Sequence, residues 1–102
     1  MKALAAAAAA TALMVAGAAH AQEQLAQASG CLTCHSVSRK IVGPAFKDVA
    51  AKYRNDKSAE AKLVAKVKNG GKGVWGDVPM PPNGHVKDAD IQTIVQWILS
   101  LK

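Results

Sequence analysis

The feature that most constrains this chain is a group of three side chains in the stretch GCLTCHS, namely Cys31, Cys34 and His35. They include the only two cysteines of the 102 residues. Residues three apart share one face of a helical turn, so the two thiols and the imidazole must reach one small region. The fold therefore has to be built around whatever these three groups bind.

The N-terminal segment has the pattern of an export signal. Residues 1–21 contain Lys2, an alanine-rich apolar run and a final Ala19-His20-Ala21, the small-x-small form that signal peptidase accepts. An uncleaved membrane anchor is the alternative, but alanine is only weakly lipophilic and a spanning helix needs about 20 strongly apolar residues. We predict a cleaved signal peptide over 1–21, a single domain over 22–102, no membrane span after cleavage and a periplasmic location.

The remaining 81 residues carry twelve basic and seven acidic side chains. A domain of this size buries only about 60% of its unfolded surface and often needs a staple, a metal or a cofactor. The basic residues are scattered from Arg39 to Lys102, which does not favour a nucleic-acid-binding stripe. A partner protein with an acidic docking patch fits better, because long-range attraction speeds encounter.

Helical periodicity recurs along the mature chain, and no segment alternates as a half-buried strand would. A short helix is expected over 22–28, another within 45–56, a third after Ser58 as N-cap, and a fourth from an Asp88 cap to Leu101. The apolar faces of the last three helices comprise Phe46, Val49, Ala50 and Tyr53, then Leu63, Val64 and Val67, then Ile91, Ile94, Val95, Ile98 and Leu99.

The segment between the last two helices has a different composition. Residues 73–84 contain three prolines and three glycines, which excludes a helix or a central strand. The predicted fold is therefore all-α, with about four to five short helices and long ordered loops.

A Cys-x-x-Cys pair in an exported chain, where thiols are normally oxidised or otherwise occupied, has several interpretations. A thioredoxin-like redox pair needs a strand leading into the helix, and none precedes Gly30. A zinc site would have to use Cys31, Cys34, His35 and His85, of which Cys34 and His35 are poorly placed to close on one ion. A disulfide across so short a loop would constrain little of the unfolded chain.

Covalent haem is the interpretation that uses all three side chains, since C-x-x-C-H is the haem c attachment signature. Cys31 and Cys34 can each add a thiol across one of two neighbouring vinyl groups. His35 is turned about 100° from Cys34 on a helix, so it points toward the ring centre and can bind iron.

A sixth iron ligand must come from elsewhere in the chain, and the mature sequence offers Met80 and His85. A methionine is by default a flexible core filler. Met80 instead lies in VPMPPN, where prolines fix the backbone and lower the entropy cost of presenting a side chain. We therefore predict Met80 as the distal ligand, following the known Met/His pairing, and place His85 on the surface. If His85 bound the iron in place of Met80, the haem would have a lower reduction potential.

Four stretches, GCLTCHS, VGPAFKDVAAKY, KNGGKGVWGDVPMPPN and IVQWILSLK, resemble those of the short bacterial class I cytochromes c. These are small monohaem electron carriers of the periplasm, and the resemblance covers 22–102. It implies thioether positions at Cys31 and Cys34, His35 as proximal ligand and Met80 as distal ligand.

The resemblance also implies supporting roles around the two ligands. The Pro44 carbonyl would accept the hydrogen of the His35 ring, and the Asn83 amide would orient the Met80 sulfur. Partners of this kind tune ligand basicity and potential.

Two tryptophans and one alanine complete what the resemblance implies. Trp75 would donate its indole N–H to a haem propionate, with Lys66 nearby. For Trp97 on the last helix we expect core packing. The first helix has Ala26 where family members commonly place an aromatic ring against the last helix, so the packing of that contact is an open point.

With both axial positions filled by protein, the iron does not readily bind a substrate, and the expected function is one-electron transfer by a monomer that is not an enzyme. The resemblance implies respiratory partners, such as a cytochrome bc1-type donor and a nitrite reductase or terminal oxidase acceptor. A haem enzyme or gas-binding module, and a haem subunit of a larger oxidoreductase, are the alternatives. Four lysines are expected to aid docking: Lys40, Lys47, Lys72 and Lys87.

Overall fold

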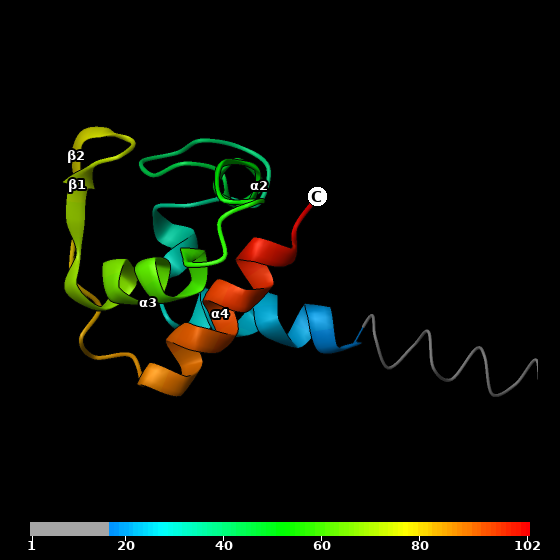
Figure 1. Cartoon of the computed structure of the whole chain (residues 1–102). Helices are drawn as coiled ribbons and strands as arrows, with labels where there is room; N and C mark the ends of the chain where they lie inside the picture. Colours follow the sequence, from blue (N-terminus) through cyan, green and yellow to red (C-terminus); the bar gives the residue numbers. More distant parts are fainter. Residues whose placement is uncertain (1–16) are drawn as a thin grey trace, which may run out of the picture.

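The computed structural model describes residues 17–102 (Figure 1). Most of the predicted signal peptide, 1–21, lies outside the described residues, and its predicted end falls within the first helix. In chain order the elements are a helix over residues 17–28, the 3₁₀ turn η1 (Cys31–Thr33), α2 (Phe46–Lys52), α3 (Ala59–Asn69), β1 (Gly71–Gly73), β2 (Gly76–Met80) and α4 (Asp88–Ser100). Within residues 17–102, no helix has the length and apolarity needed to cross a bilayer.

Helix α4 organises the core, because it packs against both α2 and α3. Its predicted apolar face is buried at Ile91, Ile94, Val95 and Ile98. Ile91 and Val95 join Val86 in a cluster against α3. Ile94 and Ile98 join Phe46 and Val49 of α2 in a second cluster. The predicted helical fold is thereby confirmed, and a single helix links the two halves of the core.

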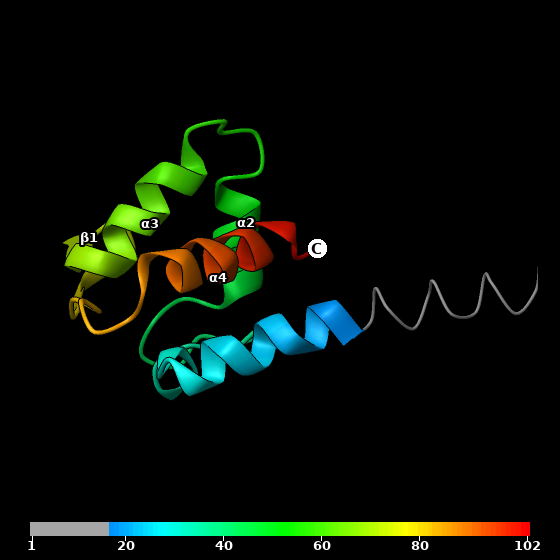
Figure 2. The ribbon, with the colours of Figure 1, turned by 90° about the horizontal axis from the view of Figure 1, so that it is seen from below.

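The first helix contacts the same core through a small residue. Ala26 is fully buried in the cluster that contains Ile94, Trp97 and Phe46, and the first helix runs alongside α4 (Figure 2). Trp97 meets the Phe46 ring edge-on, with centroids 5.7 Å apart. The aromatic contact therefore lies between α2 and α4, and alanine is sufficient where the first helix meets them.

The predicted helical fold is accompanied by one small sheet that the sequence analysis did not include. β1 and β2 form an antiparallel hairpin, with Gly71 opposite Met80 and Gly73 opposite Gly76. Every side chain of these strands except Met80 is exposed, so no buried face imposes the alternation by which strands are recognised. Pro79 is tolerated because each strand of a two-stranded sheet is an edge. The fold is mostly helical with one small sheet.

Two predicted helix caps also differ from the structure. Ser58 occupies the N-cap position of α3 but makes no side-chain capping bond, because its hydroxyl donates to Asp56 Oδ1 at 2.6 Å. Asp88 is the first residue of α4, and Lys87 occupies the N-cap position. The Asp88 carboxylate instead forms an ion pair with Lys68 of α3.

Candidate functional site

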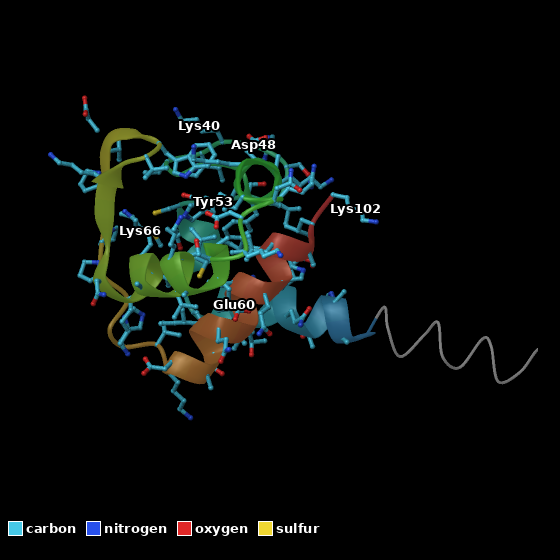
Figure 3. The ribbon with its side chains drawn as sticks, viewed as in Figure 1. Lys40, Asp48, Tyr53, Glu60, Lys66 and Lys102 are labelled. Atoms are coloured by element: carbon cyan, nitrogen blue, oxygen red, sulfur yellow. The ribbon has the colours of Figure 1, made fainter. Side chains whose placement is uncertain are left out.

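A cavity of about 280 Å³ lies between the hairpin, α2, α3 and the segment that follows the two cysteines. Tyr53 at the end of α2 and Lys66 of α3 both line it (Figure 3). Seven of the eight predicted site residues are on its wall: Cys31, Cys34, His35, Pro44, Lys66, Trp75 and Met80. Asn83 is absent from that lining, and so is the competing ligand candidate His85, which is exposed.

The two cysteines are held in one tight turn. The backbone N–H groups of Cys34 and His35 both donate to the Cys31 carbonyl, at 3.3 and 3.0 Å. The returning chain closes on the motif, because the Gly43 N–H donates to the Cys34 carbonyl at 2.7 Å. Both thiols are free and half-buried, and burial raises the pKa of the Cys31 thiol. The two thiols therefore face one cavity from a fixed backbone.

The His35 ring has a fixed orientation and tautomer. Its Nδ1 lies 2.8 Å from the Pro44 carbonyl oxygen. A carbonyl oxygen can only accept, so Nδ1 carries the hydrogen and Nε2 of the neutral ring keeps its lone pair. The ring also stacks on Phe46, with centroids 4.9 Å apart and planes inclined by 23°. His35 thus has one nitrogen engaged and one available to a metal.

Gly43 is a site residue that sequence reasoning missed. A Cβ at this position would lie 2.8 Å from His35 Nδ1 and 2.9 Å from Nε2, closer than carbon and nitrogen can approach. The backbone therefore passes directly over the ring, and any side chain at 43 would displace it. The signal available in the sequence is the Gly43-Pro44 pair, which indicates a helix break but not a close approach to a ring.

Met80 reaches the cavity from the hairpin. It is the last residue of β2 and is half-buried on the cavity wall. Gly70 sits behind it with φ of 73°, and a Cβ there would lie 2.6 Å from the Met80 carbonyl oxygen and 2.8 Å from Pro82 N. Backbone packs on backbone at this point, so Gly70 is a second position that only glycine suits. In the sequence, a glycine at this place indicates only the end of a helix.

Asn83 has partners other than the predicted one. Its Nδ2 donates to the carbonyls of Val67 at 3.2 Å and Pro81 at 3.1 Å, and its backbone N–H also donates to Val67 at 3.0 Å. The last carbonyls of a helix lack partners within the helix, which makes Val67 near the end of α3 a ready acceptor. Asn83 thereby ties the segment after Met80 to α3, and its side-chain amide donates to two backbone carbonyls.

The remaining predicted residues lie at the rim of the cavity. Trp75 is in the turn between β1 and β2 and is 43% exposed. Lys66 extends from α3 to the base of the hairpin, where a Cβ on Gly71 would lie 2.7 Å from its Nζ. Of the four lysines expected to aid docking, Lys40 and Lys72 line the cavity and the other two do not.

The donor set suits a haem. Two free thiols, an imidazole with one available nitrogen and a thioether all line one cavity, and its lining includes Phe46, Leu63 and Ile94. A thioether sulfur and an imidazole nitrogen are the ligands that haem iron takes in cytochromes c. The residues present therefore fit the prosthetic group that the motif indicates.

Comparison with known proteins agrees with this geometry. The family model "Cytochrome c" matches residues 17–102. A cytochrome c-551 of Allochromatium vinosum is 63% identical over 91 residues, covering 89% of this chain and 97% of that protein. A cytochrome c-552 of Nitrosomonas europaea is 52% identical over 94 residues, covering 92% and 91%. The crystal structure of wild-type Nitrosomonas europaea cytochrome c552 superposes with a TM-score of 0.76 at 50% identity, covering 78% of this chain and 99% of that one.

The chain belongs to the cytochrome c family, among the small bacterial class I members. It is an electron-carrier cytochrome c with one covalently bound haem c. The expectations for family, haem and mostly helical fold are confirmed.

Proposed function

We propose that this chain is a periplasmic one-electron carrier, exported by a cleaved signal peptide over 1–21, with His35 and Met80 as the axial ligands of its haem. One observation carries the proposal: both thiols, the imidazole and the thioether line the same cavity. His85, the other ligand candidate of the mature chain, is exposed and away from that cavity.

The bound haem supplies a one-electron Fe(II)/Fe(III) couple. Cys31 and Cys34 would hold it through two thioether bonds, and adding a thiol S–H across a vinyl group needs no oxidant. The protonated state of Cys31, favoured by burial, is the one that supplies this hydrogen. His35 presents Nε2, and the bond from Nδ1 to Pro44 makes that nitrogen a better electron donor.

The chain's main contribution to electron transfer is to hold both ligands still and to exclude water. The His35 ring is restrained by Pro44 and Phe46, and Met80 by the hairpin and the proline segment. Apolar residues from α2, α3 and α4 line the cavity between them. With both axial positions occupied by protein, the site exchanges electrons and does not bind a substrate.

Docking is proposed to use the rim of the cavity. Lys40 and Lys72 both line the cavity wall, and their charges would steer a partner with an acidic patch into a small transient interface. Respiratory proteins, such as a cytochrome bc1-type donor and a nitrite reductase or terminal oxidase acceptor, are the proposed partners of a monomeric carrier. Transfer rates should fall as ionic strength rises, and a rate insensitive to salt would reject the steering.

Absorption spectra of the purified mature protein in both oxidation states test the proposal. We expect the colour to remain with the polypeptide after acid-acetone extraction, since thioethers hold the haem. We also expect a sulfur-to-iron band in the near infrared for the ferric form, and weak binding of carbon monoxide to the ferrous form. Extractable haem would reject the attachment, and tight carbon monoxide binding would favour a gas-binding module or haem enzyme.

A further inference from the structure

Lys52, the last residue of α2, lies against two aromatic rings. Its ammonium nitrogen is 5.9 Å from the centroid of the Tyr53 ring and 5.7 Å from the centroid of the Trp75 ring. A cation over an aromatic face within about 6 Å is attracted by the ring quadrupole. Tyr53 packs against the core and Trp75 belongs to the hairpin turn, so a single charge bridges two parts of the molecule.

This bridge is at the free end of the hairpin. The base of the hairpin is restrained by the close backbone approach of Gly70 to Met80 and by Lys66 against Gly71. At the opposite end the turn reaches toward α2, where Lys52 meets Trp75. Strand β2 runs from that turn to Met80. Whatever holds the turn therefore also restrains the strand that presents the thioether.

We propose that Lys52 is a positioning residue that latches the hairpin turn to α2 and so limits opening of the distal wall of the cavity. The latch itself depends only on the contacts between Lys52 and the two rings. Its effect on Met80 rests on the proposed function, in which that sulfur binds iron. The structure gives Lys52 a role different from that of the docking lysines, because its charge is directed at rings of the same chain.

The chain offers a matched control on the same helix. Lys47 is exposed on α2 and carries the same charge, but both cation–π pairs found in residues 17–102 involve Lys52. Lys52→Gln removes the latch and one charge, Lys47→Gln removes one charge alone, and Lys52→Arg keeps a cation that can lie over an aromatic face. Comparing the three variants separates the ring contact from net charge.

Hydrogen exchange of the backbone amides of residues 71–80 in the haem-loaded protein measures the latch directly. We expect Lys52→Gln to exchange about two- to five-fold faster than the parent, the range that corresponds to losing an exposed cation–π contact. Lys52→Arg and Lys47→Gln should match the parent. In a protein that already carries Trp75→Leu, adding Lys52→Gln should accelerate exchange little further, because the contact between Lys52 and the Trp75 ring is already lost. Unchanged exchange in Lys52→Gln, or equal acceleration in Lys47→Gln, would overturn the latch.

The rate at which imidazole binds the ferric protein measures the effect on Met80. If Met80 is the ligand, imidazole must displace it, and Lys52→Gln should bind imidazole faster by a similar factor. Faster exchange together with an unchanged imidazole rate would support the latch and count against ligation by Met80. Unchanged amide exchange in Lys52→Gln would overturn the latch. Ligation by Met80 is tested separately, by the spectrum of Met80→Ala.

Discussion

The two walls of the haem cavity are built by different means. On the proximal wall, His35 is fixed by a side-chain bond to Pro44, by stacking on Phe46 and by the close approach of Gly43. Phe46 is in turn buried in the main core. This wall is an extension of the hydrophobic core, so loss of its packing should lower the free energy of unfolding of the whole domain.

The distal wall depends on backbone geometry. Met80 ends a strand whose other side chains are exposed, and it is followed by two prolines. The segment is attached to α3 through the bonds from Asn83 to the Val67 carbonyl and through the close approach of Gly70. Loss of these features should disturb the placement of Met80 more than it lowers the free energy of unfolding of the domain. The comparison teaches that His35 is positioned by the core itself, whereas Met80 is positioned by backbone contacts outside the core.

The largest expected effect is on the proximal wall. Phe46→Ala removes a ring that stacks on His35 and meets Trp97, and should lower the free energy of unfolding by about 3–5 kcal/mol. Ile41→Ala removes a half-exposed side chain nearby in the sequence and should change that free energy by no more than about 0.5 kcal/mol. Denaturant unfolding of both variants checks this. Equal losses would show that the proximal wall is not part of the core.

Gly43→Ala tests the close approach to the ligand ring. The added methyl would overlap the His35 ring, and overpacking of this kind should cost about 1–3 kcal/mol. The reduction potential should also change, because the ring must tilt away from its bond with Pro44. Gly84→Ala is the control, since a Cβ at 84 meets nothing within 4 Å. A Gly43→Ala protein with parental stability and potential would contradict the packing.

Gly70→Ala is the corresponding change on the distal wall. The backbone of Gly70, with φ of 73° and ψ of −174°, lies in a region that is essentially restricted to glycine, so an L side chain should cost about 1–3 kcal/mol. Its Cβ would also push against the Met80 carbonyl. We expect the near-infrared sulfur band to weaken while the haem stays attached. If Gly70→Ala lowers stability but leaves that band at full intensity, the ligand does not depend on this backbone contact.

The smallest effect is expected far from both walls, in the loop between α2 and α3. Hydrogen bonds from Ser58 and Lys62 lower the pKa of Asp56 from 3.8 to about 2. A lowered pKa means that the folded state favours the carboxylate, so its contribution is present above pH 4 and is lost as pH falls toward 2. Asp56→Asn should therefore be slightly less stable than the parent at neutral pH and equal to it near pH 2. Unfolding curves across that range, with an unchanged reduction potential, check the prediction.

Sequence reasoning reached the helices because their apolar faces are periodic. The spacing of Ile91, Ile94, Val95 and Ile98 marks α4, and a buried face requires that spacing. The hairpin carries no such signal, since its side chains are exposed. Ser58 occupies the predicted N-cap position, but Asp56 accepts its hydroxyl hydrogen. Asp88 lies one residue inside α4, where its carboxylate pairs with Lys68.

The site divides in the same way. Cys31, Cys34, His35 and Met80 could be named because their chemistry is specific and few alternatives exist in the chain. Gly43 and Gly70 could not, since a glycine that allows close approach looks the same in sequence as one that ends a helix. The contact of Lys52 with Trp75 joins residues far apart in the chain, and no spacing rule connects them.

The most direct test of the account is the near-infrared spectrum of the ferric protein in Met80→Ala and in its matched control His85→Ala. We predict that Met80→Ala keeps its haem through acid-acetone extraction, loses the sulfur-to-iron band, has a lower potential and binds imidazole readily. His85→Ala should keep the parental spectrum. A sulfur band that survives in Met80→Ala, or a spectrum that changes in His85→Ala alone, would contradict ligation by Met80.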